Sequence, residues 1–431
     1  MLMREPEHFV QEQGREVAIV GDYDVVVCGG GPAGIAAALS AAGQGMRVML
    51  LDAGGCLGGI WTSGCLSVIL DVEGKGGILA MIKSRLAALT AVLPRGNNAN
   101  FVYDVEALKA LLEELCTEAG IEILLHTRVA AVLKEGGRIQ AVITESSQGR
   151  MGISGKAFID CTGNGDLAAQ AGCAFKVGHP ETGLIQPASM LALVSGVPDA
   201  FRQMQTYEKK REFNDFLSTI GIVPSNKAPT IIELPWSGLC ILSVNHQFHV
   251  HSDNILDITQ ATISARKEIN AIVRTLREKA GWDELRLVTT PDHIGLREGR
   301  RIEGAYNLNL ADIMSGQTFE DGVCLVKFKV DIHAMEPGQS HGYGNGGIVT
   351  QPYQIPYRSL VADGVDNLGL AGRCISGDFY AHASYRVTSN AVATGEAIGF
   401  AASRMIASGS SFRAVPGAEI SLEMSRRGYQ L

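Results

Sequence analysis

The sequence lacks the features that would place it in a membrane or on a nucleic acid. None of its apolar runs approaches the roughly 18 residues that a membrane-spanning helix needs. Lys and Arg together number 37 against 45 Asp and Glu, and the net charge of -8 disfavours binding to nucleic-acid phosphates. The run Lys209, Lys210 and Arg211 is typical of an exposed helix face. We therefore expect neither a nucleic acid nor a membrane as a partner.

The sequence also lacks a CxxC pair. Its 9 cysteines are scattered, and an odd number is typical of buried thiols in a reducing compartment. The N-terminus has no apolar segment of the kind found in secretory signals. These absences predict a cytoplasmic protein. Cys56 and Cys65, with eight residues between them, leave a redox dithiol as a less favoured interpretation.

The most informative stretch is residues 24–52. An apolar run leads into Gly29, Gly31 and Gly34, which form a GxGxxG pattern before an alanine-rich segment. A second apolar run then closes on Asp52, 18 residues after Gly34. This arrangement of strand, tight turn, helix and strand suits a pyrophosphate at the helix N-terminus and a ribose hydroxyl on the acid. The stretch therefore predicts a dinucleotide site, with an ordinary glycine turn as the alternative.

Two further glycine-rich segments follow. Residues 54–65 are dense in glycine directly after the acid, so their backbone can pass close beneath a long, flat ligand. A strand ending at Asp160 continues into a D-x-T-G-x-G-D turn that closes on Asp166. About 130 residues after the first motif, this turn resembles the second nucleotide motif of flavoproteins of the glutathione-reductase type.

The periodicity of the remaining chain predicts its elements in outline. Asp104 is a candidate N-cap for the second of two amphipathic helices, and residues 121–160 read as short alternating strands. The other expected elements are helices at 76–90, 104–119, 198–218 and 259–280, and strands at 187–197 and 239–250.

Several ionisable side chains are candidates for a substrate site. His249 and His251 would share one face of the strand 239–250, as a wall of the cavity or as plain strand residues, whereas a metal site is disfavoured because no third ligand is evident. The arginine cluster at 297–301 is expected to form structural ion pairs, with Arg297 as the exception that holds an anion. Asp331 and His333 can pair with each other or act on substrate.

The sequence resembles the FAD-dependent oxidoreductase family, short flavoproteins distantly related to fumarate reductase and succinate dehydrogenase. The segments that carry the resemblance span about residues 16–405 and are YDVVVCGGGPAGIAAALSAA, DAGGCLGGIWTSG, IDCTGNGD, IGLREGRRIEG, IPYRSL and LAGRCISGDFYAHASYRV. The resemblance implies an α/β fold with a discontinuous, glutathione-reductase-type FAD-binding Rossmann-like domain. That domain comprises residues 16–183 and 352–412 with a β meander inserted at about 121–155, and a central α+β substrate domain comprises residues 184–351.

The resemblance also implies FAD as the cofactor. Asp378 would contact the ribityl chain, the backbone near Val129 would lie by the adenine, and the helix that starts near Arg386 would meet the isoalloxazine. His382 and Arg386 echo the His and Arg that bind a substrate carboxylate in fumarate-reductase-like enzymes, although the local sequence is HASYR and not HGxNR. The expected FAD contacts are Gly29, Gly31, Pro32, Ala33, Gly34, Asp52, Ala53, Gly58, Gly59, Trp61, Thr62, Val129, Thr162, Gly163, Asp166, Gly372, Asp378, Arg386, Val387 and Ser389.

The expected activity is hydride transfer between flavin N5 and a small polar substrate with a CH–OH or CH–NH group. Two alternatives remain: reduction of a C=C bond next to a carboxylate, and a non-catalytic flavin-binding or tRNA-modification accessory role. The expected catalytic side chains are His382, Arg386, Arg297 and His249. A small-molecule substrate, an unidentified electron acceptor and a homo-oligomer are the expected partners, and no metal is expected.

Overall fold

The computed structural model describes residues 14–96, 99–202, 204–236, 238–339 and 341–431. The first 13 residues, on which the expectation of no secretory signal rests, lie outside this part of the chain. In the described ranges, no helix combines the length and apolar character needed to cross a bilayer.

A seven-stranded sheet forms the centre of the larger half of the molecule. Strands β6, β2, β1 and β9 lie side by side and parallel, and β20 adds a further parallel strand to β9. Strands β7, β8 and β9 pair antiparallel within the stretch for which the sequence predicts a meander. The strands are β1 (Ile19–Cys28), β2 (Val48–Leu51), β6 (Glu122–Leu124), β7 (Arg128–Glu135), β8 (Arg138–Ser146), β9 (Gly149–Asp160) and β20 (Leu368–Leu370).

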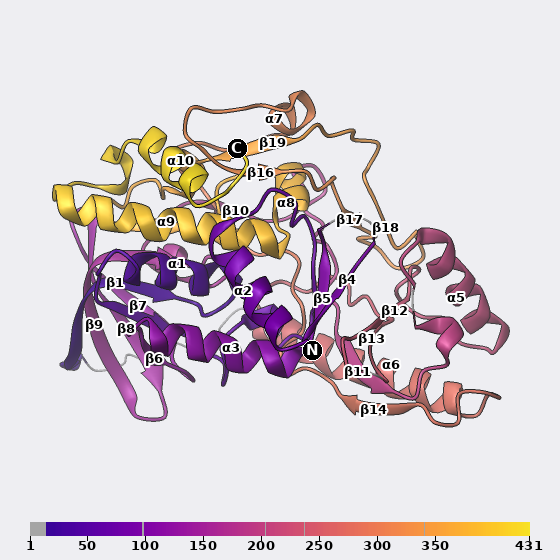
Figure 1. Cartoon of the computed structure of the whole chain (residues 1–431). Helices are drawn as coiled ribbons and strands as arrows, with labels where there is room; N and C mark the ends of the chain where they lie inside the picture. Colours follow the sequence, from indigo (N-terminus) through magenta and orange to yellow (C-terminus); the bar gives the residue numbers. More distant parts are fainter. Residues whose placement is uncertain (1–13, 97–98, 203, 237, 340) are drawn as a thin grey trace.

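Helices from the two ends of the chain cover one side of this sheet. Helix α9 (Thr388–Ser408) lies along α1 (Pro32–Ala42), although more than 300 residues separate them (Figure 1). The helices approach closely because α9 has glycines at the contact: a Cβ on Gly395 would clash with the carbonyl oxygen of Ala33. Helices α2 (Gly77–Ala88) and α3 (Val105–Glu118) pack beside them.

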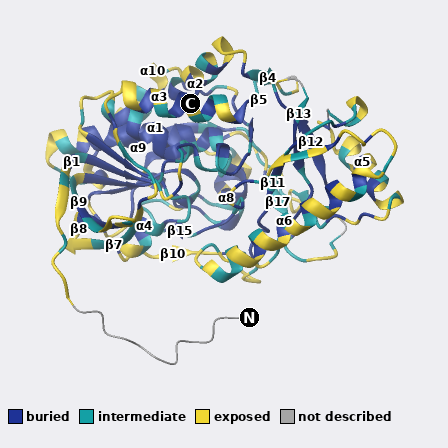
Figure 2. Ribbon diagram, turned by 90° about the horizontal axis from the view of Figure 1, so that it is seen from below, coloured by how far each residue is buried: buried dark blue, intermediate teal, exposed yellow. Residues whose placement is uncertain are grey.

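A four-stranded antiparallel sheet forms the other end of the molecule (Figure 1). Its strand order is β12, β13, β11, β14, and the outer faces of α5 and α6 are exposed to solvent (Figure 2). These elements are β11 (Leu191–Ser195), α5 (Tyr207–Thr219), β12 (Thr230–Glu233), β13 (Leu239–Ser243), α6 (Ile255–Arg277) and β14 (Arg286–Thr289).

Short elements connect the two ends. The remaining strands are β3 (Val68–Ile69), β4 (Val92–Pro94), β5 (Phe101–Tyr103), β10 (Phe175–Lys176), β15 (Arg301–Ile302), β16 (Gly322–Val326), β17 (Ile332–His333), β18 (Tyr343–Gly344) and β19 (Tyr353–Pro356). The remaining helices are α4 (Asp166–Gln170), α7 (Leu310–Ser315), α8 (Phe379–Tyr385), α10 (Gly417–Arg426) and the 3-10 turns η1 (Gly59–Trp61), η2 (Asp199–Phe201), η3 (Tyr357–Leu360), η4 (Gly372–Cys374) and η5 (Phe412–Ala414).

The molecule has two main hydrophobic cores. The larger contains residues from Tyr23 to Cys173 and again from Ile302 to Tyr429, and the smaller contains residues from Ala188 to Ile294. The chain therefore leaves the larger core once and returns to it. The domain boundaries given above stay a prediction.

The predicted helices agree with the structure better than the predicted strands do. Asp104 caps α3 by accepting a hydrogen bond from the backbone N–H of Ala107, as expected. The strand predicted at 239–250 is wrong in its second half, because β13 ends at Ser243. His249 lies in a loop with a φ of 57°, a left-handed conformation that no strand residue adopts.

Candidate functional site

The turn between β1 and α1 leaves open space in front of the helix. Gly29 has a φ of 103°, which favours glycine, and a Cβ on Gly34 would lie 1.7 Å from the carbonyl oxygen of Gly29. Gly31 is the N-cap and gives the helix no side-chain hydrogen bond, and a Cβ there would have no atom within 4 Å among the described residues. The first N–H groups of α1 therefore face a space that suits a phosphate.

Asp52 fastens this turn to the end of β2. Its carboxylate accepts hydrogen bonds from the backbone N–H groups of Gly30 and Gly54, each at 2.6 Å. Each oxygen keeps a second lone pair, so the side chain can still accept a hydrogen bond from a ribose hydroxyl. Ala53, the neighbouring predicted contact, is exposed.

The glycine-dense loop folds back over the turn. The N–H of Gly58 donates to the carbonyl oxygen of Gly30 at 2.7 Å, and a Cβ on Gly59 would lie 3.1 Å from the Cα of Gly31. Trp61 is fully buried, and its indole N–H has no hydrogen-bond partner among the described residues. Thr62 is occupied within the loop, because its hydroxyl donates to the carbonyl oxygen of Leu57.

The second nucleotide turn lies against the first. A Cβ on Gly29 would clash with the carbonyl group of Cys161. The hydroxyl of Thr162 donates to Asp160 at 2.7 Å and accepts from the N–H of Asp166 at 2.9 Å, which fixes the turn into α4. Gly163 has a φ of 74°.

A half-buried arginine that was not predicted covers this second turn. The guanidinium of Arg373 lies where a Cβ on Gly163 would be, and it donates to the side chain of Asn164 at 2.6 Å. Its Nε has no partner among the described residues. The preceding Gly372 has a φ of 79°, and a Cβ on it would lie 3.2 Å from the Cβ of Ala33. Val129, the residue predicted near the adenine, lies in β7 and pairs with Thr144.

The N-terminus of α9 is the second uncapped helix start at the site. Val387 is its N-cap and provides no side-chain hydrogen bond. Ser389, in the first turn, is fully buried, and its hydroxyl has no partner among the described residues. Asp378 is differently placed: it caps α8 by accepting from Ala381 and also accepts from the N–H of Leu310. Both of its oxygens are therefore already engaged by the backbone.

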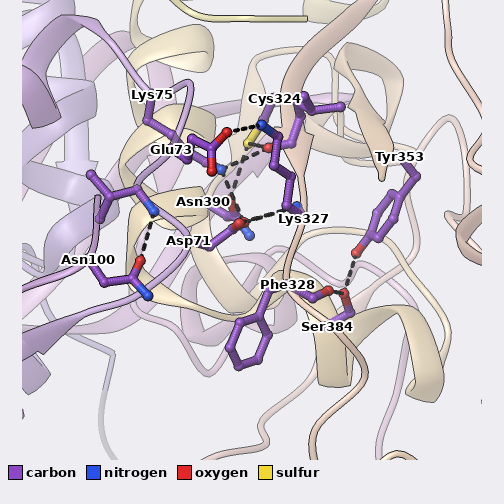
Figure 3. A network of polar contacts seen from close by, with 12 residues as sticks. Asp71, Glu73, Lys75, Asn100, Cys324, Lys327, Phe328, Tyr353, Ser384 and Asn390 are labelled. Atoms are coloured by element: carbon purple, nitrogen blue, oxygen red, sulfur yellow. Dashed lines mark hydrogen bonds and ion pairs between the residues drawn. The ribbon is translucent and has the colours of Figure 1, made fainter. Parts of the chain in front are cut away.

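A polar network reaches the first turn of α9 through Asn390 (Figure 3). Asn390 accepts a hydrogen bond from the thiol of Cys324. Nearby, Lys75 forms an ion pair of 3.1 Å with Asp71, and both side chains are almost completely buried, with 1% and 3% exposed. Lys75 also donates to the carbonyl oxygen of Leu325. The network ties the loop after β3 to the strand β16 that lies beside α9.

These observations fit a bound FAD. Two uncapped helix starts, the space at Gly31, and the unpartnered polar atoms of Trp61, Ser389 and Arg373 lie on segments that contact one another. Such buried donors are costly without a partner, so a polar ligand is expected to satisfy them. The first helix start suits the pyrophosphate, and the second provides positive charge for the flavin.

Two arginines lie beside the start of α9. Arg386 donates from Nη2 to the backbone oxygen of Asp331 at 2.8 Å and to the side-chain oxygen of Gln186 at 3.2 Å. Arg297 donates from Nη1 to the carbonyl oxygen of Pro187 and, at 2.9 Å, to the hydroxyl of Ser189. Burial and then the charge of Arg386 lower the pKa of Arg297 to about 9, which leaves both guanidinium groups charged at neutral pH. Together they suit an anionic substrate.

The rest of the arginine cluster has structural partners. Arg301 and Glu298 form a buried ion pair of 3.0 Å, and Glu298 also accepts from the N–H of Gln186. Arg300 pairs with Asp166 at 2.9 Å. The structural ion pairs agree with the prediction for Arg300 and Arg301, and the predicted anion-binding role of Arg297 stays a prediction.

His382 lies in α8, completely buried, and neither ring nitrogen has a hydrogen-bond partner among the described residues. Burial and then the charges of Arg301, Arg386 and Arg373 hold its pKa well below the usual range. The ring is therefore neutral and can accept one hydrogen bond and donate another.

His249 does not belong with these side chains. It lies in an exposed loop and pairs with Glu336 at 3.4 Å. The prediction that His249 and His251 share a strand face is wrong, because the strand ends before both of them, and His251 pairs instead with Asp257 at 2.9 Å. The buried histidine of this segment is His246, with 2% exposed.

The sequence did not indicate a role for three residues that the structure places near the predicted site: Gln186, His246 and Arg373. Gln186 was not singled out, although it accepts hydrogen bonds from both Arg386 and the N–H of His333. His246 and Arg373 were visible in the NHQFHVH and LAGRC segments, but nothing in those segments indicated which side chain is buried. No group of three or more His, Cys, Asp or Glu side chains in the described ranges can hold a metal ion.

Comparison with curated proteins and solved structures gives partial relatives. One of them, the tRNA uridine 5-carboxymethylaminomethyl modification enzyme of Thermus thermophilus, is 34% identical over 136 residues. That match covers 28% of this chain and only 22% of the relative's own length. The chain therefore spans about a fifth of that enzyme, and the match says nothing of the enzyme's remaining parts.

Two solved structures match nearly the whole chain. A p-nitrophenol 4-monooxygenase from Pseudomonas putida has a TM-score of 0.51 at 13% identity, with 94% of this chain and 85% of that chain covered. A geranylgeranyl bacteriochlorophyll reductase-like protein from Thermoplasma acidophilum has a TM-score of 0.50 at 12% identity, with 95% and 84% covered. At these identities the likeness concerns the fold alone.

The decisive match is to a family. Residues 24–424 match the family described as FAD dependent oxidoreductase, which is nearly the whole chain and includes both glycine turns and the start of α9. The coarse prediction of an α/β fold with a parallel sheet is confirmed, as is FAD as the cofactor. The chain belongs to the FAD dependent oxidoreductase family.

Proposed function

We propose that this FAD-dependent oxidoreductase oxidises a CH–OH or CH–NH group of a small substrate that carries a carboxylate. The observation that carries the proposal is a pair of neighbouring arginines: Arg386 directly precedes the N-cap of α9, where the flavin ring is expected, and its charge acts on Arg297. When bound, FAD provides a two-electron acceptor at N5.

The two arginines and His382 would act on different parts of the substrate. Arg297 and Arg386 would bind the carboxylate and orient the substrate, because both are charged and held in place by backbone oxygens. His382 would exchange hydrogen bonds with the reacting group through its two unpartnered ring nitrogens. His382 is completely buried, which keeps water away from its ring nitrogens.

Reduction of a C=C bond next to a carboxylate is the second candidate. It is supported by the same arginines together with His382, which lies four residues before Arg386 on α8. A tRNA-modification accessory role has less support, because the similarity to the Thermus enzyme covers only 28% of this chain and the net charge is -8.

A substrate screen with the FAD-loaded protein tests the proposal. Flavin absorbance near roughly 450 nm should bleach under anaerobic conditions with a 2-hydroxycarboxylate or 2-aminocarboxylate such as lactate, malate, alanine or proline. Arg386→Met should weaken binding of that substrate at least tenfold while FAD stays bound. Arg404→Met, on the exposed part of α9, is the matched control. If instead chemically reduced flavin is reoxidised by fumarate or a related unsaturated acid, the second candidate replaces the first.

A further inference from the structure

Three side chains form a row beside the two arginines. His333 and Asp331 lie at β17: the Nε2 atom of His333 is 3.2 Å from Oδ2 of Asp331. On the other side of the ring, Nδ1 of His333 is 3.1 Å from Nε2 of His246, which follows β13 in the chain. Two segments almost 90 residues apart therefore meet in one continuous hydrogen-bonded row.

The protons in this row can be placed by donor and acceptor arithmetic. An ionised Asp331 only accepts, so Nε2 of His333 carries a proton, and in a neutral His333 the other nitrogen, Nδ1, carries a lone pair. Nε2 of His246 must then donate to His333, which leaves the lone pair of His246 on Nδ1. For two neutral imidazoles and one carboxylate, this is the arrangement that gives every hydrogen bond in the row a donor and an acceptor.

The charges around the row agree with this assignment. Burial would raise the pKa of Asp331, but His333, Arg386 and Arg297 hold it well below the usual range. Burial and then Arg297 lower the pKa of His333 to about 4, and burial followed by Arg297 and His333 lowers that of His246 further. At neutral pH the carboxylate is charged and both rings are neutral.

The free end of the row is buried and unsatisfied. Nδ1 of His246 has no hydrogen-bond partner among the described residues, and the side chain is 2% exposed. Its backbone is held by a hydrogen bond from its own N–H to the hydroxyl of Ser225 at 2.9 Å. A lone pair buried in this way calls for a ligand that donates a hydrogen bond.

We propose that His246 is the general base of the reaction and that His333 and Asp331 are positioning residues that fix its tautomer. This rests on the proposed function. The O–H or N–H bond of the substrate breaks and its proton forms a bond with Nδ1 of His246. The electron pair left behind forms the C=O or C=N bond as the hydride leaves to the oxidant that FAD provides.

Because of the two arginines, the pKa of His246 depends on whether the substrate is bound. The field of Arg297 opposes protonation of His246 while the site has no bound anion, and Arg386 and Arg297 act in the same way on His333. Asp331 opposes both effects. Tyr343, whose ring lies 5.7 Å from that of His333, and Lys210, which donates to the Tyr343 hydroxyl at 3.2 Å, are further titratable groups near the row. A bound carboxylate would offset the arginine charges and so raise the pKa of His246.

The first test does not depend on turnover. Nitrogen NMR of the FAD-loaded protein with ¹⁵N-labelled histidine should show His246 protonated on Nε2 and unprotonated on Nδ1, with His333 protonated on Nε2. Asp331→Asn should reduce the population of this tautomer of His246, because the ionised acceptor at the end of the row is gone. A proton on Nδ1 of His246 in the unaltered protein overturns the proposal.

The second test measures the rate of flavin reduction. His246→Gln keeps an N–H donor near the Nε2 position but has no lone pair at Nδ1, so the rate should fall by about 10²–10⁴ with FAD retained. The pH dependence of kcat, which reports ionisations in the substrate complex, should lose one ionisation in this variant, which a merely structural role would not cause. His251→Gln, in the exposed loop, is the matched control and should change neither.

The outcomes separate the two proposals. If a substrate bleaches the unaltered protein and His246→Gln at the same rate, the row has no catalytic role and the proposed function stands. If none of the hydroxy or amino acids bleaches the flavin, the proposed function fails for that class of substrate. The tautomer measurement then decides by itself whether the row is built as inferred.

Discussion

Single residues decide whether the glycine turn can hold a phosphate. Gly31 differs from Gly29 and Gly34, because its φ of -75° is open to any residue and a Cβ there would meet no described atom within 4 Å. Its lack of a side chain is therefore not explained by the backbone or by packing. The remaining explanation is the ligand in front of α1.

Gly31→Ala should consequently separate FAD binding from folding. The free energy of unfolding of the apoprotein should change by at most about 0.5 kcal/mol, as for an unstrained exposed substitution. The Kd for FAD should rise at least tenfold in a fluorescence titration. Gly137→Ala, in the exposed β7–β8 turn, is the control. Equal FAD affinity in both variants would place the phosphate elsewhere.

A second residue-scale prediction concerns the buried ion pair of Lys75 and Asp71 (Figure 3). Lys75→Met leaves the carboxylate buried without its cation, which should cost about 3–5 kcal/mol in urea unfolding. Lys109→Met removes the largely exposed pair with Glu106 and should cost at most about 1 kcal/mol.

The double variant Lys75→Met with Asp71→Asn should recover much of that loss, because no unpaired charge remains. Asn also tolerates the φ of 58° at this position. Failure of the double variant to recover any stability would mean that the hydrogen bonds from Lys75 to Leu325 and from the Lys327 N–H to Asp71, not the charge pair, hold the network together.

At the scale of elements, the contact between α1 and α9 sets the distance between the two uncapped helix starts. Gly395→Ala should gain about 1 kcal/mol of helix propensity in an open site. Here its Cβ would clash with the carbonyl oxygen of Ala33, so overpacking should give a net loss of about 1–3 kcal/mol.

Because the clash moves one helix start relative to the other, Gly395→Ala should also weaken FAD binding. Ala407→Ser, near the exposed end of the same helix, should change neither quantity. Urea unfolding and FAD titration of the two variants measure both effects. A stability loss with unchanged FAD affinity would show that the two helix starts do not bind the same molecule.

At the scale of the whole molecule, buried neutral histidines make stability depend on pH. His333 has a pKa of about 4 in the folded state because of burial and then Arg297, against about 6.5 in the unfolded chain. Between these values the unfolded chain binds a proton that the folded protein does not. The free energy of unfolding therefore falls as pH drops from about 6.5 to about 4, by up to about 3 kcal/mol from this group.

The measurement is urea unfolding of the apoprotein and of His333→Gln at several pH values. The variant should be less stable at pH 7 but should lose less stability on acidification, so the two curves converge below about pH 6.5. Above that pH the difference should be constant. Parallel curves throughout would contradict a neutral, buried His333.

Patterns among neighbouring residues were enough to predict the glycine turns and helix starts of the nucleotide-binding half of the protein. The run of apolar residues, glycines and alanines at 24–52 is contiguous, and the strand, tight turn, helix and strand that it predicts concern neighbours in the chain. The same holds for Asp104 as the cap of α3 and for the uncapped start of α9. The hydrogen bonds that Asp52 accepts from the turn were not predicted. The family resemblance of these segments then implied FAD as the cofactor, which the family match confirms.

The substrate half required the tertiary structure. Alternation along NHQFHVH favoured His249, yet β13 ends early and the fold buries His246 against His333 instead. Gln186, Arg297, Asp331 and Arg386 come from four separate segments, and no spacing in the sequence links them.

The physical reason is the range over which each feature is determined. Turn conformation, helix capping and strand period are fixed by residues a few positions apart, so the sequence by itself determined the glycine turns and the helix starts, and the resemblance of these segments to a family implied the cofactor. Burial, pKa and hydrogen-bond pairing of residues such as Arg386, Asp331 and His246 depend on which distant segments pack together. Only the tertiary structure decided them.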